Sequence, residues 1–454
     1  MRVPVLNGAG QVISSVEQLG EIDRLGETTP YGTPAPTIGF AGHSVPATGV
    51  SNTATRTRMF NYGMAHWVPA LALQGVETRQ NLVIATAGIT SAGFISRIPE
   101  VVAAKADNFV LDLGTNDPSF ASFEQNMPTI MDAILGSNKR LILVPVMPRS
   151  LVTQATRDMY QYMAARAKEW GQLGIKGLHV VDVADEYGDP TSANWAPKQD
   201  PGNEYDDMHP AGLGGYRISK KIAALLRQFY PPAPLITSVA SQFSAENPRG
   251  NLIPNGVLLG TGGTGSTNNG ITVSGSAVPD GMNILATAPY SGGSALSGLT
   301  MAMAKLTDAD GTNVSQITYT GGYVGDVDTV LGLRWSGGAG DYPKLVAGDW
   351  VEARCHFTLK PSAVVAEFAG FQLVVILTMG GTSYYAIDGY AVSSGRLPAE
   401  GYTAILKTPP LQVTATPTLE QVYLVGVPTQ GTITIDDPIV VQIRNMQLTK
   451  VPAP

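Results

Sequence analysis

The stretch Thr37-Ile38-Gly39-Phe40-Ala41-Gly42-His43-Ser44 combines an apolar run with a glycine and a serine at the point where a strand would end. In an open α/β sheet, the carboxyl ends of the strands border the crevice where ligands bind. A rigid strand would therefore hold the Ser44 hydroxyl where a nucleophile is needed. Alone, such a serine is more often part of a simple turn, so the rest of the chain has to support this hypothesis.

Beyond this stretch, strand-like runs alternate with helical segments up to about residue 230. The strand-like runs are Thr37–Ala41, Leu82–Ala87, Phe109–Leu113, Leu141–Val146 and Val180–Val183, and the helical segments lie near 58–74, 92–105, 119–135, 153–173 and 212–229. This alternation predicts an α/β fold with a parallel sheet that is covered on both faces. Catalytic residues are then expected in the loops that follow the strands.

The second half has a different composition, rich in Gly, Ser and Thr, and predicts an all-β, jelly-roll-like sandwich. Strands are expected over Val351–Leu359, Phe371–Leu377, Ile433–Ile435 and Val440–Ile443. The proline cluster near Pro231 cannot continue a helix and separates the two parts. We therefore predict an N-terminal segment at 1–36 for attachment or packing, a catalytic domain at 37–232 and a β-sandwich domain at 240–454. A capping box at Ser14–Glu17 predicts a short helix in the first segment.

Composition restricts the partners and cofactors. Of the 454 residues 44% are hydrophobic and only 14% are charged, which indicates an ordered globular protein rather than a disordered one. The net charge of −7 and the lack of a Lys/Arg cluster argue against nucleic acid as a partner. No apolar run is long enough for membrane insertion, and no signal peptide is recognisable, so the localisation stays open. Cys355 is the only cysteine, so no multi-cysteine metal site is expected and no cofactor is implied.

Three later stretches also follow predicted strands and, with Ser44, contain the groups that acyl transfer requires. They contain Gly88, Gly114-Thr115-Asn116-Asp117 and Asp206-Asp207-Met208-His209. Acyl transfer needs a nucleophile, a base, a carboxylate that orients the base, and donors for the oxyanion. Ser44 supplies the hydroxyl, His209 can take its proton, and Asp206 can turn back to the other ring nitrogen. The Gly88 N–H and the Asn116 amide are candidate oxyanion donors.

In order and spacing, these stretches resemble the four sequence blocks of the SGNH hydrolases, also called GDSL esterases and lipases. Gly42-His43-Ser44 is similar to the first block and Gly88 to the glycine of the second. Gly114-Thr115-Asn116-Asp117 matches the third block, and Asp206-x-x-His209 matches the last. The resemblance covers about residues 37–230. It implies a three-layer α/β/α sandwich with a five-stranded parallel sheet, Ser44, Asp206 and His209 as the catalytic triad, and Gly88 and Asn116 as the oxyanion hole.

One residue departs from this pattern, because the family usually has Asp where this chain has His43. His43 either supports the serine loop, the interpretation we favour, or contacts substrate. Asp207 competes with Asp206 as the orienting carboxylate, but the block spacing favours Asp206. Three other histidines, His66, His179 and His356, fit structural roles, and no metal site is expected.

The segment Asn251–Gly256 and the Gly/Thr-rich sequence after it loosely resemble β-sandwich modules of phage tail-associated proteins and of carbohydrate-binding domains. The aromatic side chains of Trp335, Tyr384, Tyr385 and Tyr390 could stack on sugar rings, although aromatics in β domains more often belong to the core.

The leading hypothesis is a serine esterase that removes short acyl groups, above all acetyl, from a carbohydrate such as a bacterial surface polysaccharide in a phage context. The alternatives are a small-ester or lipid esterase with a structural β domain, and a non-enzymatic glycan-binding adhesin or virion component. The expected partner is an O-acylated carbohydrate. A homo-oligomer is compatible with the sequence, and a trimer is expected if the protein belongs to a phage tail.

Overall fold

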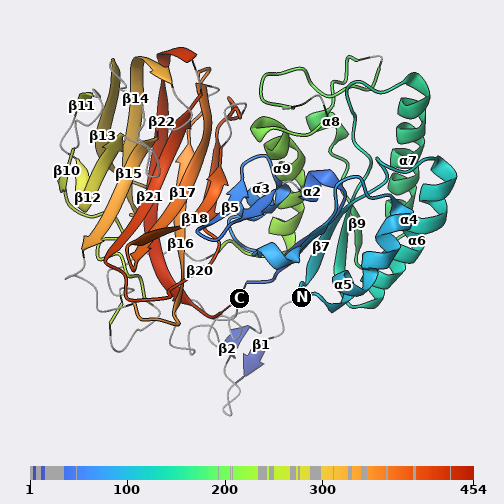
Figure 1. The fold of residues 1–454 in the computed structure, drawn as a ribbon, viewed down its shortest axis with the longest axis horizontal. Coiled ribbons are helices and arrows are strands. Elements are labelled where there is room, and N and C mark those ends of the chain that lie inside the picture. Colours follow the sequence, from blue (N-terminus) through green and yellow to red (C-terminus); the bar gives the residue numbers. More distant parts are fainter. Residues whose placement is uncertain are drawn as a thin grey trace.

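In the computed structural model, two units lie side by side, an α/β unit and a β-sandwich (Figure 1). The structure describes residues 35–453 except 48, 193, 205, 207, 234–242, 245–249, 266–271, 275–276, 287–297, 310, 326–329, 339–344, 365–366, 392–394 and 430, together with strands β1 (Pro4–Leu6) and β2 (Val12–Ser15). Residues 16–34 lie outside this part, so the helix predicted to follow the capping box lies outside the described residues. Ser14 and Ser15 of the capping box are the last two residues of β2.

The α/β unit is built on a five-stranded parallel sheet in the order β6-β3-β7-β8-β9. The strands are β3 (Ile38–Gly42), β6 (Val83–Ala85), β7 (Asn108–Asp112), β8 (Arg140–Val144) and β9 (Leu178–Val180). The first four coincide with runs predicted from the sequence, whereas β9 shares only Val180 with the predicted run Val180–Val183 and begins two residues earlier. Because all strands are parallel, their carboxyl ends lie along one edge, and β3 occupies the position where the strand order reverses.

Helices cover both faces of this sheet, which confirms the predicted three-layer α/β/α sandwich. One layer contains α3 (Met64–Leu71) and α9 (Gly212–Phe229), and the other contains α4 (Ser91–Phe94), η2 (Ile95–Arg97), α5 (Ile98–Ala103), α6 (Phe120–Gly136) and α7 (Gln154–Gln172). Alternate residues of β7 face the two layers, so that Val110 packs with the α3 side and Leu111 packs with the α6 side.

The second unit is a sandwich of two large sheets, as the sequence predicts. One sheet has the order β10-β12-β15-β21-β17-β18-β5-β4 and the other β11-β13-β14-β22-β16-β19, with β20 paired to β16. The first sheet contains β10 (Gly262–Thr264), β12 (Val278–Ala286), β15 (Leu331–Gly338), β17 (Phe368–Met379), β18 (Thr382–Tyr390) and β21 (Leu419–Pro428). The second contains β11 (Thr272–Ser274), β13 (Leu299–Thr307), β14 (Asn313–Gly325), β16 (Trp350–Leu359), β19 (Tyr402–Lys407), β20 (Leu411–Gln412) and β22 (Gly431–Val451).

A part of the α/β unit completes the first sheet of the sandwich. β4 (Val50–Asn52) and β5 (Arg56–Phe60) form a hairpin, and β5 pairs in parallel with β18 from more than 300 residues later (Figure 1). The sequence predicts a continuous helix over 58–74 instead. The helix begins only at Met64, because residues 56–60 find hydrogen-bonding partners in a strand that is distant in sequence.

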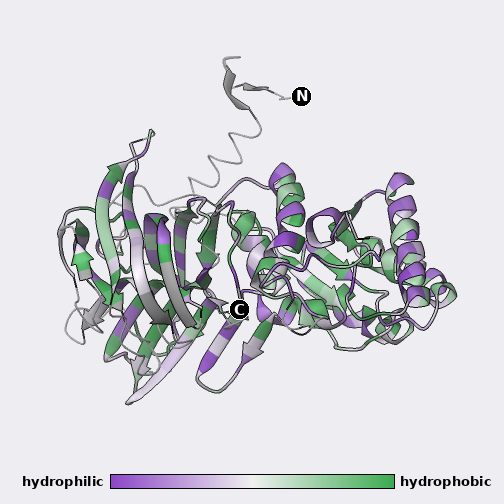
Figure 2. Cartoon of the chain, turned by 90° about the horizontal axis from the view of Figure 1, so that it is seen from above, coloured by the Kyte–Doolittle hydropathy of each residue, from purple (hydrophilic) through white to green (hydrophobic). Residues whose placement is uncertain are grey.

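The apolar core runs through the junction of the two units without interruption. Trp67 of α3 packs against Tyr216 of α9 and Tyr402 of β19, with ring centroids 5.4 and 5.2 Å apart. Tyr402 in turn meets Phe357 inside the sandwich. Figure 2 shows hydrophobic residues along the strands of both units when the molecule is seen from above. A shared core of this kind indicates that the two units stabilise one another.

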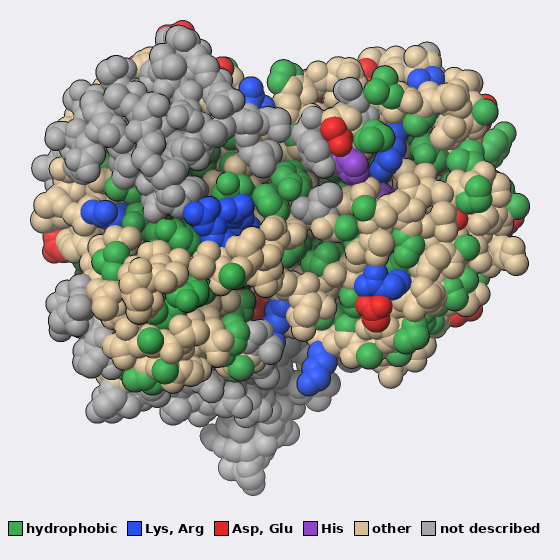
Figure 3. Space-filling model, in the orientation of Figure 1, with side chains coloured by type: hydrophobic (Ala, Val, Ile, Leu, Met, Phe, Trp, Pro, Cys, Tyr) green, Lys and Arg blue, Asp and Glu red, His purple; other side chains and the backbone are tan. Residues whose placement is uncertain are grey.

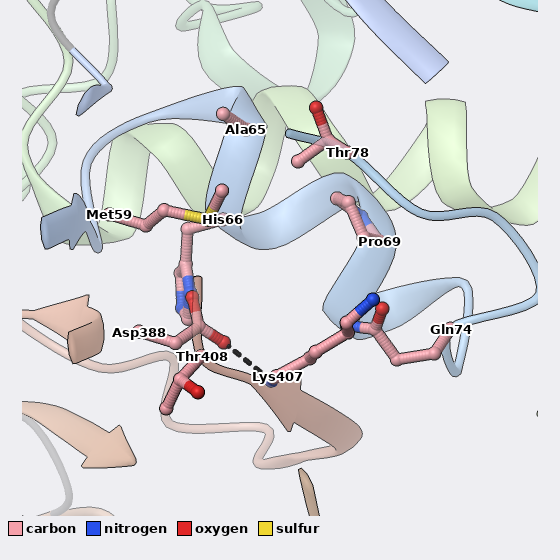
Figure 4. A pocket seen from close by; sticks show the side chains of 9 residues that line it. All are labelled: Met59, Ala65, His66, Pro69, Gln74, Thr78, Asp388, Lys407 and Thr408. Carbon is pink, nitrogen blue, oxygen red and sulfur yellow. Dashed lines mark hydrogen bonds and ion pairs between the residues drawn. The ribbon is translucent and has the colours of Figure 1, made fainter. Parts of the chain in front are cut away.

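Buried charges also join the two units. Glu77 of the α/β unit accepts ion pairs from Arg354 and Lys407, each at 2.6 Å, and Glu352 contacts both cations. Burial alone would raise the pKa of Glu77, but the two cations lower it to about 2. Nearby, His66 of α3 meets Asp388 of β18 at 2.7 Å, and the Asp388 carboxylate accepts the Lys407 backbone N–H (Figure 4).

Over the described part of the chain, no helix combines the length and apolar character that crossing a membrane requires.

Candidate active site

The serine loop begins where β3 ends, as predicted. Gly42 has a φ of +135°, and a Cβ at this position would lie 1.9 Å from the Asp112 carbonyl oxygen, so only glycine fits. His43 follows, and Ser44 is the first residue of the short helix α2 (Ser44–Ala47). Ser44 is 8% exposed, which leaves part of it accessible at the carboxyl edge of the sheet.

The off-pattern residue His43 is completely buried beneath this loop. Its Nε2 lies 3.0 Å from Asp112 Oδ1 and 3.2 Å from Thr115 Oγ1. Its Nδ1 accepts the backbone N–H of Val45 at 3.3 Å, so Nδ1 carries no proton and Nε2–H donates. Because His43 has no exposed surface, this geometry favours support of the serine loop over contact with substrate.

The two predicted oxyanion donors belong to loops that touch each other. Gly88 follows β6 in a turn with φ of +76°, is exposed, and has no atom within 4 Å of where a Cβ would stand. The Asn116 amide donates to the carbonyl oxygen of Ile89, the next residue after Gly88, at 3.2 Å. The structure therefore brings the second and third blocks together.

The carboxylate of Asp117 joins the same two loops through hydrogen bonds. It accepts hydrogen bonds from the Ser91 backbone N–H at 3.1 Å and from the Ser91 hydroxyl at 2.7 Å. Burial raises the pKa of Asp117, and these hydrogen bonds oppose the rise. Gly114 needs its glycine because a Cβ would lie 2.6 Å from Val146. The third block thus has both a positioning and a packing role.

Asp206 and His209 form a tight pair in the loop that precedes α9. Asp206 Oδ2 lies 2.8 Å from His209 Nδ1, while Oδ1 accepts the backbone N–H groups of His209 and Met208 at 2.7 and 3.1 Å. Burial of Asp206 alone would raise its pKa, but the hydrogen bonds from the His209 ring and backbone outweigh this and lower it. An ionised Asp206 fixes the His209 ring with Nδ1 protonated, so Nε2 is the nitrogen that can act as a base.

No sequence pattern identifies the residues that anchor this loop. Glu204 accepts hydrogen bonds from the Ser150 hydroxyl at 2.8 Å and from the Tyr187 phenol at 2.9 Å. Ser150 belongs to the loop after β8, so this bond ties the His209 loop to the carboxyl edge of the sheet. On the other side, Gly202 packs against Arg396 of the sandwich, where a Cβ would lie 2.5 Å from the Arg396 Cβ. Such contacts depend on residues far apart in sequence.

The remaining residues singled out in the sequence lie elsewhere. Asp207 is outside the described residues. His66 is paired with Asp388 at the junction, and His179 packs against Phe229. His356 is buried in β16 with neither ring nitrogen hydrogen-bonded, and burial lowers its pKa to about 4. Within the described residues, no three His, Cys, Asp or Glu side chains group as metal ligands.

Of the aromatic residues considered for sugar stacking, Trp335 is 4% exposed and belongs to the sandwich core. Tyr384 also packs against that core. The rings of Tyr385 and Tyr390 are covered by the guanidinium groups of Arg56 and Arg58, at 5.1 and 4.4 Å. Trp335 is therefore a core residue, whereas Tyr384, Tyr385 and Tyr390 are only partly buried.

No family model and no curated protein matches the sequence. Among solved structures, a GDSL-like lipase from Bacteroides thetaiotaomicron has 16% identity and a TM-score of 0.31, covering 47% of this chain and 98% of its own. A family 3 carbohydrate esterase from Clostridium thermocellum has 15% identity and a TM-score of 0.32, covering 43% and 98%. A two-domain esterase active on acetylated mannans has 10% identity and a TM-score of 0.31, covering 94% of each chain.

Proposed function

We propose that the protein is a serine esterase that removes short acyl groups, above all acetyl, from a carbohydrate. The observation that carries the proposal is the Asp206–His209 pair, in which one carboxylate oxygen holds the ring nitrogen and the other accepts two backbone N–H groups. This arrangement prepares a base, and Ser44 stands at the strand end where a nucleophile is presented. No cofactor is invoked.

In the proposed mechanism, Ser44 Oγ attacks the ester carbonyl while His209 Nε2 takes the hydroxyl proton. The oxyanion that forms is stabilised by the Gly88 N–H and the Asn116 amide, each donor being worth ~10²–10³ in rate. His209 then gives its proton to the leaving sugar hydroxyl, and the acyl–Ser44 ester remains. Water, deprotonated by His209, releases the acid and restores the serine.

The first test is hydrolysis of 4-nitrophenyl acetate by the full-length wild type and by Ser44→Ala. Loss of the nucleophile should lower kcat by at least about 10³-fold with the fold intact. Ser137→Ala is the matched control, because Ser137 caps the carboxyl end of α6 and precedes β8 at the opposite edge of the sheet. Equal rates for wild type and Ser44→Ala would overturn the esterase mechanism.

The carbohydrate part of the proposal needs its own test. Acetate release is measured from O-acetylated polysaccharides, with simple acetyl and longer-chain esters in parallel. Preference for acetylated glycans supports the proposal. Turnover of simple or lipid esters without acetate release from any glycan would assign the protein to the small-ester or lipid class. Glycan binding that persists without turnover of any ester would assign it to the adhesins.

A further inference from the structure

The loop after β8 carries an arginine that the proposed mechanism does not use. Arg149 is half-buried, and its Nη2 atom is buried without a hydrogen-bond partner. Within the described part of the chain, no hydrogen bond or ion pair to the Arg149 side chain is found. A guanidinium has five N–H donors, and leaving a buried one unsatisfied is costly. The buried Nη2 of Arg149 therefore has a donor that a ligand can satisfy.

Three neighbours place Arg149 between the two halves of the candidate site. Ser150, the next residue, donates to Glu204 in the His209 loop. Tyr160, whose phenol donates to the Thr115 carbonyl beside Asn116, feels the Arg149 charge, which opposes the rise in pKa that burial causes. The same charge acts on the pKa of Tyr187, which bonds Glu204. Arg149 therefore lies near both the Asn116 loop and the His209 loop.

Figure 3 shows a histidine with an acidic and a basic side chain beside it on one face of the α/β unit, and a second pair of a basic and an acidic side chain elsewhere on that face. Near Arg149, Asp206 is hydrogen-bonded to His209, and Glu204 to Ser150 and Tyr187. Arg149 Nη2 has no hydrogen-bond partner among the described residues, so it keeps a donor for an anionic group of the substrate.

We propose that Arg149 binds a carboxylate on the substrate, so that the preferred glycan carries uronic acid residues at or next to the acylated sugar. A planar guanidinium matches a carboxylate in a bidentate manner, which lysine cannot reproduce. This inference rests on the proposed esterase function and names its substrate class. It assigns Arg149 to binding and specificity, and the chemical steps remain with Ser44 and His209.

Binding to a protein that cannot turn over separates this inference from the esterase proposal. Ser44→Ala is titrated with a set of O-acetylated uronate oligosaccharides and with the same oligosaccharides after their carboxyl groups are reduced to hydroxymethyl groups. Each pair differs only in the charge. We expect the acidic member of at least one pair to bind about 10- to 100-fold more tightly, as a charge-assisted hydrogen bond predicts, and the difference to shrink at high salt.

Variants assign the effect to Arg149. Arg149→Met in the Ser44→Ala background should abolish the preference for the acidic member, and Arg149→Lys should restore only part of it. The control is Arg166→Met, which removes an arginine of α7 that is paired with Glu124 and Glu169 on the surface. If no acidic oligosaccharide binds better than its reduced partner, or if Arg149→Met leaves the preference unchanged, the inference is wrong. If the preference holds but the wild type hydrolyses no ester, only the esterase proposal fails.

Discussion

The pair formed by His43 and Asp112 offers a quantitative test of how the serine loop is held. The sequence block that Gly42-His43-Ser44 resembles usually has aspartate at the position of His43, so His43→Asp is the smallest change towards that pattern. In this structure it places a second carboxylate beside Asp112, which has no exposed surface and whose Oδ2 is already without a partner. It also removes the ring nitrogen that accepts the Val45 N–H.

The expected loss of unfolding free energy follows from the distance between the two carboxylates. Two carboxylates about 4 Å apart repel by roughly 4 kcal/mol at an effective dielectric constant near 20, and proton uptake by one of them limits the cost. Loss of the His43 hydrogen bond to the Asp112 carboxylate costs a further amount of about 1.5–3 kcal/mol. We expect His43→Asp to lower the free energy of unfolding by about 3 kcal/mol. Misplacement of Ser44 should also lower kcat by about 10- to 100-fold.

A double-mutant cycle tests whether repulsion between the two carboxylates causes the loss of stability. Asp112→Asn added to His43→Asp removes one carboxylate and should recover at least about 1 kcal/mol. The assays are urea unfolding at pH 7, kcat on 4-nitrophenyl acetate and the rate at which a fluorophosphonate labels Ser44. Asp388→Asn breaks the equally buried His66–Asp388 pair and should destabilise the fold without slowing the labelling. Strictly additive effects, or a harmless His43→Asp, would contradict this account of the loop.

Two further predictions concern the junction between the units. The pKa of Glu77 is about 2 in the folded protein and 4.5 ordinarily, so its ionised form stabilises the fold. This contribution, on the order of 3 kcal/mol, is fully present above pH 4.5 and is lost as pH falls towards 2. In thermal unfolding, Glu77→Gln should therefore be less stable than wild type at pH 7 and lose less stability between pH 4.5 and 2. If the variant loses as much stability as wild type over this pH range, the ion-pair network does not make this contribution. A fragment of residues 1–233 should be insoluble or non-cooperative in unfolding, because it leaves β5 without β18 and exposes Trp67 and Tyr216. A soluble, cooperatively folded fragment would show that the junction is dispensable.

Much of the fold could be predicted because its signals are local. Each strand of the parallel sheet is a short apolar run of five residues or fewer, and the helices that cover the sheet repeat apolar residues at helical spacing. The candidate site residues could be predicted for a related reason. Gly42 and Gly114 have positive φ, which favours glycine, and the Asp206–His209 spacing allows a short hydrogen bond within one loop, so the residue types themselves record these local requirements.

The sequence by itself therefore determined the α/β and all-β character of the two parts and the residues proposed for acyl transfer. Only the tertiary structure decided that β5 joins the sandwich, that His43 pairs with Asp112, and that Glu204 anchors the His209 loop. It also decided that Arg149 Nη2 is buried without a hydrogen-bond partner among the described residues. The physical reason is that these features depend on strands and side chains distant in sequence, and the free energy of such contacts exists only after the chain has brought them together.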